Sequence, residues 1–178
     1  MKTFGLQSCF LTFRTRGTWL HGDPRGSQDR FRNEYGTPRI SHTPAWQDEE
    51  ACRLRHPPVT LDTAMRRIVH DAIVDKCDWR GWPLHALRIR TEHVHAVLSC
   101  SISPDDAMNQ LKSWCTRKLR EAGLISADLK PWSRHGSTVY LYRQSQFDAA
   151  CRYVRDEQGE DLDNWVDVEA RYGNEQER

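Results

Sequence analysis

The chain has 178 residues, of which 38% are apolar and 29% are charged, a composition that is ordinary for one folded domain with a real core. No apolar run approaches membrane-spanning length and the first residues lack the long apolar core of a signal peptide, so we expect a cytoplasmic protein without a membrane segment. The net charge of +1 is unevenly distributed, because residues 156–178 hold nine acidic and two basic residues and form an acidic tail on a basic body.

The basic body is rich in arginine rather than lysine, with 21 Arg against 5 Lys in the whole chain, and the chain contains seven Trp. Arginine suits bidentate contacts to phosphate, and indole rings offer surfaces for base stacking, so the composition favours nucleic-acid binding. An arginine-rich composition also follows from a GC-rich genome, which is the alternative explanation. Six cysteines form no Cys-x-x-Cys pair, and we expect them to be reduced, mostly buried thiols.

Alternating residues predict a first strand over 6–16, with Arg14 and Arg16 at one edge, where a phosphate could be met. The pattern then dissolves over 17–58, where Gly, Pro, Asp, Asn, Ser and Arg surround scattered aromatic residues. A long irregular segment inside a compact domain is usually functional or disordered. We expect an irregular insertion that contacts nucleic acid.

An apolar stripe predicts a helix from about residue 60 to Cys77, followed by strands over 84–90 and 93–101 joined as a hairpin. Ser103 and Pro104 then begin a helix that Gly123 ends, with Lys112 and Arg117 on its exposed side. A fourth strand is predicted over 136–143, and Ser145 is predicted to cap a last helix over 146–158.

This order of elements predicts an α+β fold, a ferredoxin-like split βαβ antiparallel sheet with helices on one face and an added C-terminal helix. The expected domain covers residues 1–158, with the irregular insertion over 17–58 and an acidic tail over 159–178. This topology serves RNA-recognition modules, acylphosphatase-like enzymes and nucleases, so the fold alone does not select a function.

Two imidazoles on one strand are the first candidate site. If 93–100 is a strand, then His93, His95, Val97 and Ser99 point to one face and the residues between them enter the core. Two neighbouring imidazoles make a bidentate metal platform or a polar binding surface. With 8 His in the chain, chance supplies such a pair fairly often, and a satisfied structural pair is the alternative.

The last helix carries the second candidate. Ala149, Tyr153 and Glu157 recur every four residues and share one face, with Gln158 beside it. A small residue, a phenol and an oxygen ligand make an unusual packing stripe, although tyrosine on a helix is more often a core or rim residue.

His93-Val94-His95 between apolar flanks resembles the His-hydrophobe-His motif of HUH single-strand endonucleases. A tyrosine helix that comes last, after Trp132-Ser133-Arg134 and a strand, resembles the single-tyrosine transposases of the IS200/IS605 group, especially the REP-associated tyrosine transposases. The resemblance covers residues 6–16 and 61–158; the long 17–58 segment and the acidic tail depart from it.

The resemblance implies that His93 and His95 bind a divalent metal ion, Mg²⁺ or Mn²⁺, and that Tyr153 is the catalytic nucleophile. Relatives commonly have Gln, Asn or His four positions after the tyrosine, where this chain has Glu157. Spacing favours Glu157 as third metal ligand, while residue type favours Gln158. Arg14, Arg16, Lys112 and Arg117 are expected DNA contacts, each with a solvated surface charge as the alternative.

We therefore expect a DNA-binding transposase-like enzyme that nicks and rejoins single-stranded or hairpin DNA through a 5′-phosphotyrosine intermediate. Relatives are dimers or monomers, so either a monomer or a homodimer is expected. Two other functions fit the same residues. One is a catalytically silent module that binds DNA or RNA hairpins, and the other is a metal-dependent phosphodiesterase that uses water.

Overall fold

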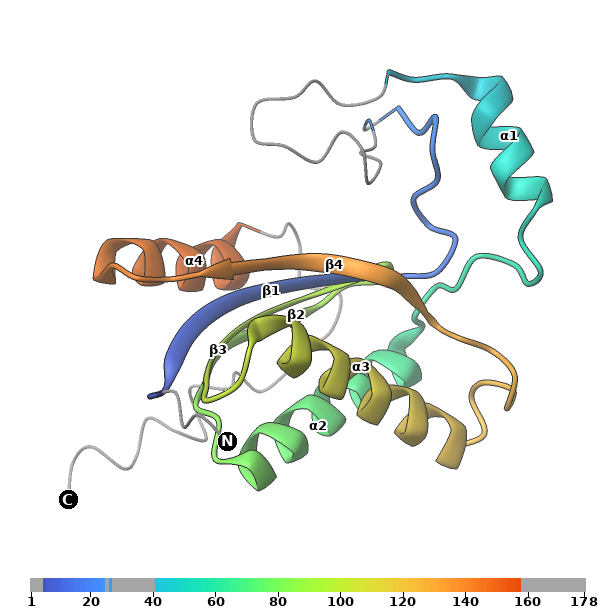
Figure 1. The fold of residues 1–178 in the computed structure, drawn as a ribbon. Coiled ribbons are helices and arrows are strands. Elements are labelled where there is room, and N and C mark those ends of the chain that lie inside the picture. The colour runs from blue at the N-terminus through green and yellow to red at the C-terminus, as the bar shows by residue number, and fades with distance from the viewer. Residues whose placement is uncertain (1–4, 25, 27–40, 158–178) are drawn as a thin grey trace.

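The computed structural model of the chain describes residues 5–24, 26 and 41–157. Residues 25 and 27–40 of the insertion, Gln158 and the acidic tail lie outside them. The described part holds four strands and four helices (Figure 1). In chain order they are β1 (Gln7–Thr15), α1 (Pro44–Cys52), α2 (Thr63–Arg80), β2 (Leu84–Ile89), β3 (His93–Cys100), α3 (Pro104–Glu121), β4 (Trp132–Tyr140) and α4 (Gln144–Asp156).

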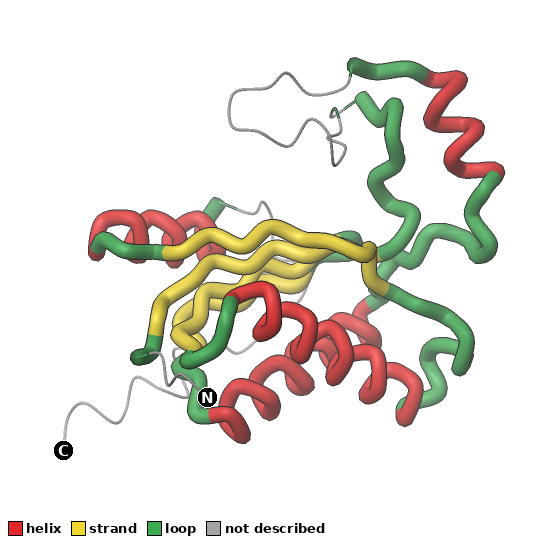
Figure 2. Tube along the Cα trace, in the orientation of Figure 1, coloured by secondary structure: helices red, strands yellow, loops and turns green. Residues whose placement is uncertain are grey.

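The four strands form one antiparallel sheet in the order β2-β3-β1-β4, which is the split βαβ arrangement that the sequence predicted. Figure 2 shows three layers, with α2 and α3 under one face of the sheet and α4 on the other. Strand β1 lies between β3 and β4, so its residues reach both the histidine strand and the strand that leads to α4.

Side-chain alternation along β1 and β3 divides the interior into two clusters. Val94, Ala96, Leu98 and Cys100 enter the large core that the sheet shares with α2 and α3. Val97 points the other way, into a small cluster with Ala86 and with Ala150, Cys151 and Val154 of α4. The predicted alternation of β3 is therefore confirmed, and it places the histidines on the α4 side of the sheet.

The helix ends follow local signals. The Asp62 carboxylate accepts a hydrogen bond from the Met65 backbone N–H at the start of α2, and Gly81 ends that helix in the left-handed region at φ 62°. Ser103 caps α3 in the same way and Pro104 occupies its first turn, as the sequence predicted. Among the described helices, none combines the length and the apolar character needed to cross a bilayer.

Three sequence predictions need correction. The 17–58 segment is not irregular throughout, because residues 44–52 form α1. None of the residues of α1 is buried, so this helix lacks the apolar stripe by which a helix is predicted from sequence. Strand β4 begins four residues earlier than predicted, where Trp132 packs edge-on against Phe13 at 5.0 Å between ring centroids. Helix α4 is capped at Arg143 rather than Ser145, and the Arg143 backbone N–H donates to Oε1 of Gln146 at 3.1 Å.

All six cysteines are free thiols in the structure. Five are buried and Cys52, on α1, is exposed. Burial raises the pKa of the Cys77 thiol to about 12, which keeps that side chain protonated at neutral pH.

Candidate functional site

The two histidines stand side by side on an inner strand. Alternation along β3 sends His93 and His95 to the same face, and their ring centroids lie 4.7 Å apart with an interplanar angle of 71°. His95 is buried, at 6% exposure, whereas His93 is half-buried near the beginning of the strand. Strands hold their side chains more rigidly than loops do, so the pair is a fixed two-nitrogen platform.

A threonine on the neighbouring strand orients the buried histidine. Thr12 pairs with His95 in the register between β1 and β3, and its Oγ1 lies 2.8 Å from Nδ1 of His95. When Nδ1 carries the proton, it donates to the hydroxyl and leaves the lone pair of Nε2 for a metal ion. Ligating histidines usually have such a partner on the second nitrogen, so this contact fits a metal site.

Tyr153 is brought against the histidine strand. Helix α4 buries Ala150, Cys151 and Val154 and leaves the Tyr153 side chain 39% exposed. The Tyr153 ring lies edge-on to His95, 5.6 Å between centroids and 75° between planes, and 6.0 Å from Phe10 of β1. The structure therefore brings together residues that are 58 positions apart in the sequence.

The end of α4 is attached to the sheet by a cation. The Arg155 guanidinium donates to the backbone carbonyl of His85 on β2 at 2.9 Å. Nε2 of His85 lies 2.8 Å from the Ser99 hydroxyl, and Phe147 of α4 packs edge-on against the imidazole. Burial, with a smaller contribution from Arg155, lowers the pKa of His85 below its usual value.

The third metal ligand stays a prediction. Glu157 is exposed at the C-terminal end of α4, where its backbone N–H donates to the Tyr153 carbonyl. Within residues 5–24, 26 and 41–157, no three His, Cys, Asp or Glu side chains converge as a metal-binding group. The histidine pair is thus the part of the predicted donor set that the structure brings together, and Gln158, the alternative ligand, is outside the described residues.

Tyr153 and His95 lie in an open groove with a volume of about 1030 Å³. Strand β1 contributes Phe10, Thr12 and Arg14 to its lining, and the segment after β1 contributes Trp19 and His21. The Arg14 guanidinium lies 3.8 Å from the Trp19 ring centroid, and His21 stacks on Trp46 at 5.1 Å. Cations and aromatic rings in one groove suit a nucleic-acid strand.

The four predicted DNA contacts have different surroundings. Arg14 lines the groove, while Arg16 is not among its lining residues. Arg117 is exposed on α3 and pairs with Glu121 at 2.8 Å. The prediction that Lys112 is exposed is wrong: it is 7% exposed, and its ammonium donates to the carbonyls of Ser133 and His135.

Sequence reasoning missed several groove residues. Arg134 and His135 of β4 line the groove, as does Glu50 of α1. The early start of β4 would have placed Arg134 beside the site, but the signal for that start is the packing of Trp132 on Phe13, a contact between distant segments. Phe10 was assigned to the correct strand but not to the site.

A comparison with solved structures finds similarity to a REP-associated tyrosine transposase bound to a REP hairpin, with a TM-score of 0.48 and 12% sequence identity. The match covers 83% of this chain and 64% of the transposase chain, so this chain spans less than two thirds of the length of the transposase. No protein-family model matches the chain. A search of curated proteins also finds no match. The chemistry of this chain therefore has to be inferred from its own side chains.

Proposed function

We propose that this protein is a metal-dependent DNA strand transferase that cuts and rejoins single-stranded or hairpin DNA through a covalent bond to Tyr153. The observation that carries the proposal is the packing of the Tyr153 ring, 5.6 Å from the ring of His95, inside a groove lined by Arg14 and Arg134. A nucleophile, a candidate metal platform and phosphate-binding cations are the parts that such a reaction needs.

The reaction begins with Tyr153 Oη attacking the phosphorus of a phosphodiester. A bond from Oη to phosphorus forms while the bond from phosphorus to the 3′ oxygen breaks, which leaves a 5′-phosphotyrosine and a free 3′-OH. The phenol proton is lost and the departing oxygen gains one, so the step needs no water and no nucleotide cofactor. Attack by a second 3′-OH reverses the chemistry and joins two strands.

The phenol needs help to react, because a free tyrosine has a pKa of about 10. Arg14 and Arg134 line the groove that contains Tyr153. Their guanidinium groups would hold the scissile phosphate within reach of the Tyr153 hydroxyl. Thr12 supports the site by fixing the orientation of the His95 imidazole.

His93 and His95 would hold the metal ion, with Glu157, or Gln158 as the alternative, as third ligand. Mg²⁺ or Mn²⁺ bound there would act as a Lewis acid on a phosphate oxygen. Imidazole ligands favour Mn²⁺ by type, whereas abundance and phosphate oxygens favour Mg²⁺.

A second candidate function is a nucleic-acid hairpin-binding module without chemistry. The Arg14–Trp19 stack favours it, because this pair offers a cation for a phosphate and an aromatic surface for a base without requiring Tyr153 to react. The two functions share the groove and differ only in whether the tyrosine forms a bond with DNA.

The test incubates a labelled single-stranded oligonucleotide with the protein and Mn²⁺ and separates the products on a denaturing gel. We expect a covalent adduct in the wild type that is absent in Tyr153→Phe. Tyr142→Phe is the matched control, since Tyr142 is an exposed tyrosine that does not line the groove.

Each other outcome assigns a different function. An adduct that persists in Tyr153→Phe rejects Tyr153 as the nucleophile. Cleaved DNA without an adduct in the wild type indicates a phosphodiesterase that uses water. Binding without cleavage in Mg²⁺ and in Mn²⁺ indicates the binding module.

A further inference from the structure

A second aromatic and basic surface lies on α2 and α3, on the other side of the sheet from α4 (Figure 1). We call it the α2–α3 surface and define it by Lys76, Trp79, Arg80, Gln110 and Trp114. The Trp79 side chain is 72% exposed, although tryptophan usually buries most of its area. An indole exposed to this extent presents an aromatic face on which a nucleic-acid base can stack.

Cations surround the two indoles of this surface. The Lys76 ammonium lies 4.3 Å from the Trp79 ring centroid and 5.3 Å from that of Trp114, so it is placed between the two rings. The Arg80 guanidinium is 5.0 Å from the Trp79 ring. On the far side of Trp114, Arg117 and Lys118 lie 5.4 and 5.1 Å from that ring.

Lys76 and Arg80 have no acidic partner in the part of the chain that the structure describes. Arg117 and Lys118 are paired with Glu121, but Lys76 makes no ion pair, and Arg80 donates to the neutral amide oxygen of Gln110 at 3.0 Å. Burial, and to a smaller extent the neighbouring Arg80, lowers the pKa of Lys76. The surface therefore has positive charge available for an anionic partner.

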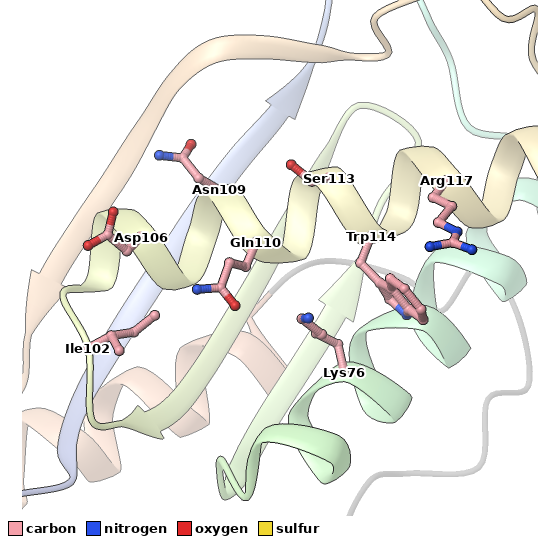
Figure 3. Close-up of a pocket in the computed structure, with 8 residues that line it drawn as sticks. All are labelled: Lys76, Ile102, Asp106, Asn109, Gln110, Ser113, Trp114 and Arg117. Atoms are coloured by element: carbon pink, nitrogen blue, oxygen red, sulfur yellow. The ribbon is translucent and has the colours of Figure 1, made fainter.

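Beside the rings, α2 and α3 border a depression with a volume of about 480 Å³ (Figure 3). Figure 3 shows Lys76 reaching from α2 toward Trp114 and Gln110 of α3. Asn109 and Ser113 add polar groups along the same helix. The Trp114 indole N–H is shielded from solvent and has no acceptor among the described residues.

We propose that the α2–α3 surface is a second binding site for single-stranded nucleic acid, in which a base stacks on Trp79 and phosphates contact Lys76 and Arg80. Cations alone would fit any polyanion, but an exposed indole between them fits a strand whose bases are unstacked. A duplex would meet the cations without presenting the face of a base to Trp79. The proposal concerns binding only and does not depend on the chemistry of Tyr153.

The test measures the affinity of the full chain for a labelled single-stranded oligonucleotide of roughly 30 nucleotides. A single site typically covers about 4–16 nucleotides, so an oligonucleotide of this length can contact more than one surface of the protein. The variant is the double substitution Trp79→Ala with Lys76→Gln. We expect affinity to fall about tenfold and the slope of log affinity against log salt to fall by about 0.7 for the lost phosphate contact. On a blunt duplex of the same length, the loss should be smaller.

The matched control is Tyr142→Ala with Lys130→Gln, which also removes an exposed aromatic ring and an exposed lysine. Thermal unfolding of both double variants should match the wild type, because the substituted side chains are on the surface. Unchanged affinity and salt slope in the α2–α3 variant, or an equal loss in the control, would overturn the proposal. An equal loss on duplex would overturn the assignment to single strands.

A third arm separates this inference from the proposed function. Arg14→Ala with Arg134→Ala removes cations of the groove and leaves the α2–α3 surface intact. If only the groove variant loses affinity, the second site is rejected and the groove remains a nucleic-acid site. If only the α2–α3 variant loses affinity, the second site stands and the proposed role of the groove is rejected.

Discussion

Thr12 and His95 are joined across neighbouring strands, with Oγ1 of the threonine 2.8 Å from Nδ1 of the imidazole. If Nδ1 carries the proton, Nε2 is the nitrogen of His95 that could bind the proposed metal ion. The hydrogen bond also links the histidine pair to β1, so a substitution in β1 should alter the orientation of His95.

Thr12→Val should weaken Mn²⁺ binding by about 10- to 100-fold, the usual effect of losing the partner of a ligating histidine. The substitution keeps the shape of the side chain and removes only its hydroxyl. Calorimetric titration of Mn²⁺ into the protein measures the effect. Thr138→Val, which removes the hydroxyl that donates to Asp105, is the control. Equal affinity in wild type and Thr12→Val would mean that His95 does not bind the metal.

Gly136→Ala should destabilise the fold and also weaken the site. A Cβ at this position would lie 2.5 Å from the Thr12 carbonyl oxygen and 2.5 Å from Met108 Sδ, so β1 or α3 must shift. Overpacking of this kind costs about 1–3 kcal/mol. Urea unfolding measures the loss, and Mn²⁺ affinity should fall with it. Gly5→Ala, which places a Cβ in open space, should leave both quantities unchanged.

Lys112→Met should lower the free energy of unfolding by about 1–3 kcal/mol, because two partly buried backbone carbonyls lose a charged donor. Those carbonyls, of Ser133 and His135, belong to β4, so the lysine ties α3 to that strand. Part of this loss in the free energy of unfolding is offset, because the variant no longer has to bury the Lys112 ammonium. Lys118→Met on the exposed side of the same helix should change stability by no more than about 0.5 kcal/mol. If Lys112→Met is as stable as the wild type, the hydrogen bonds from Lys112 to β4 do not contribute to stability.

Acid should destabilise the protein partly through His85. Its pKa is lowered in the folded state, so below the ordinary value of about 6.5 the unfolded chain binds the proton more readily. This contribution to stability is present above that pH and is lost as the pH falls. Urea unfolding at pH 7.5 and pH 5.5 should show a smaller difference in His85→Gln than in the wild type. An identical difference in the two proteins would contradict this assignment.

The sequence was sufficient to predict those parts of the structure that depend on the periodicity of one strand or on one local capping signal. Alternation in β3 placed both histidines on one face, and the Ser103 cap located the start of α3. The sequence was insufficient where the structure depends on contacts between residues that are far apart in the chain. The burial of Lys112 depends on β4 crossing α3, and the beginning of β4 depends on Trp132 meeting Phe13. The approach of Tyr153 to His95 is likewise a property of how α4 packs on the sheet, which no spacing within α4 encodes.

The distribution of the cysteines has a practical consequence. Because the other five thiols are buried, a maleimide dye added to the native protein should attach at Cys52 alone. Cys52 follows Glu50, a lining residue of the groove, on α1. An unmodified chain thus carries its own attachment point for a fluorophore close to the groove, which could be used to test the proposed binding of a nucleic-acid strand there.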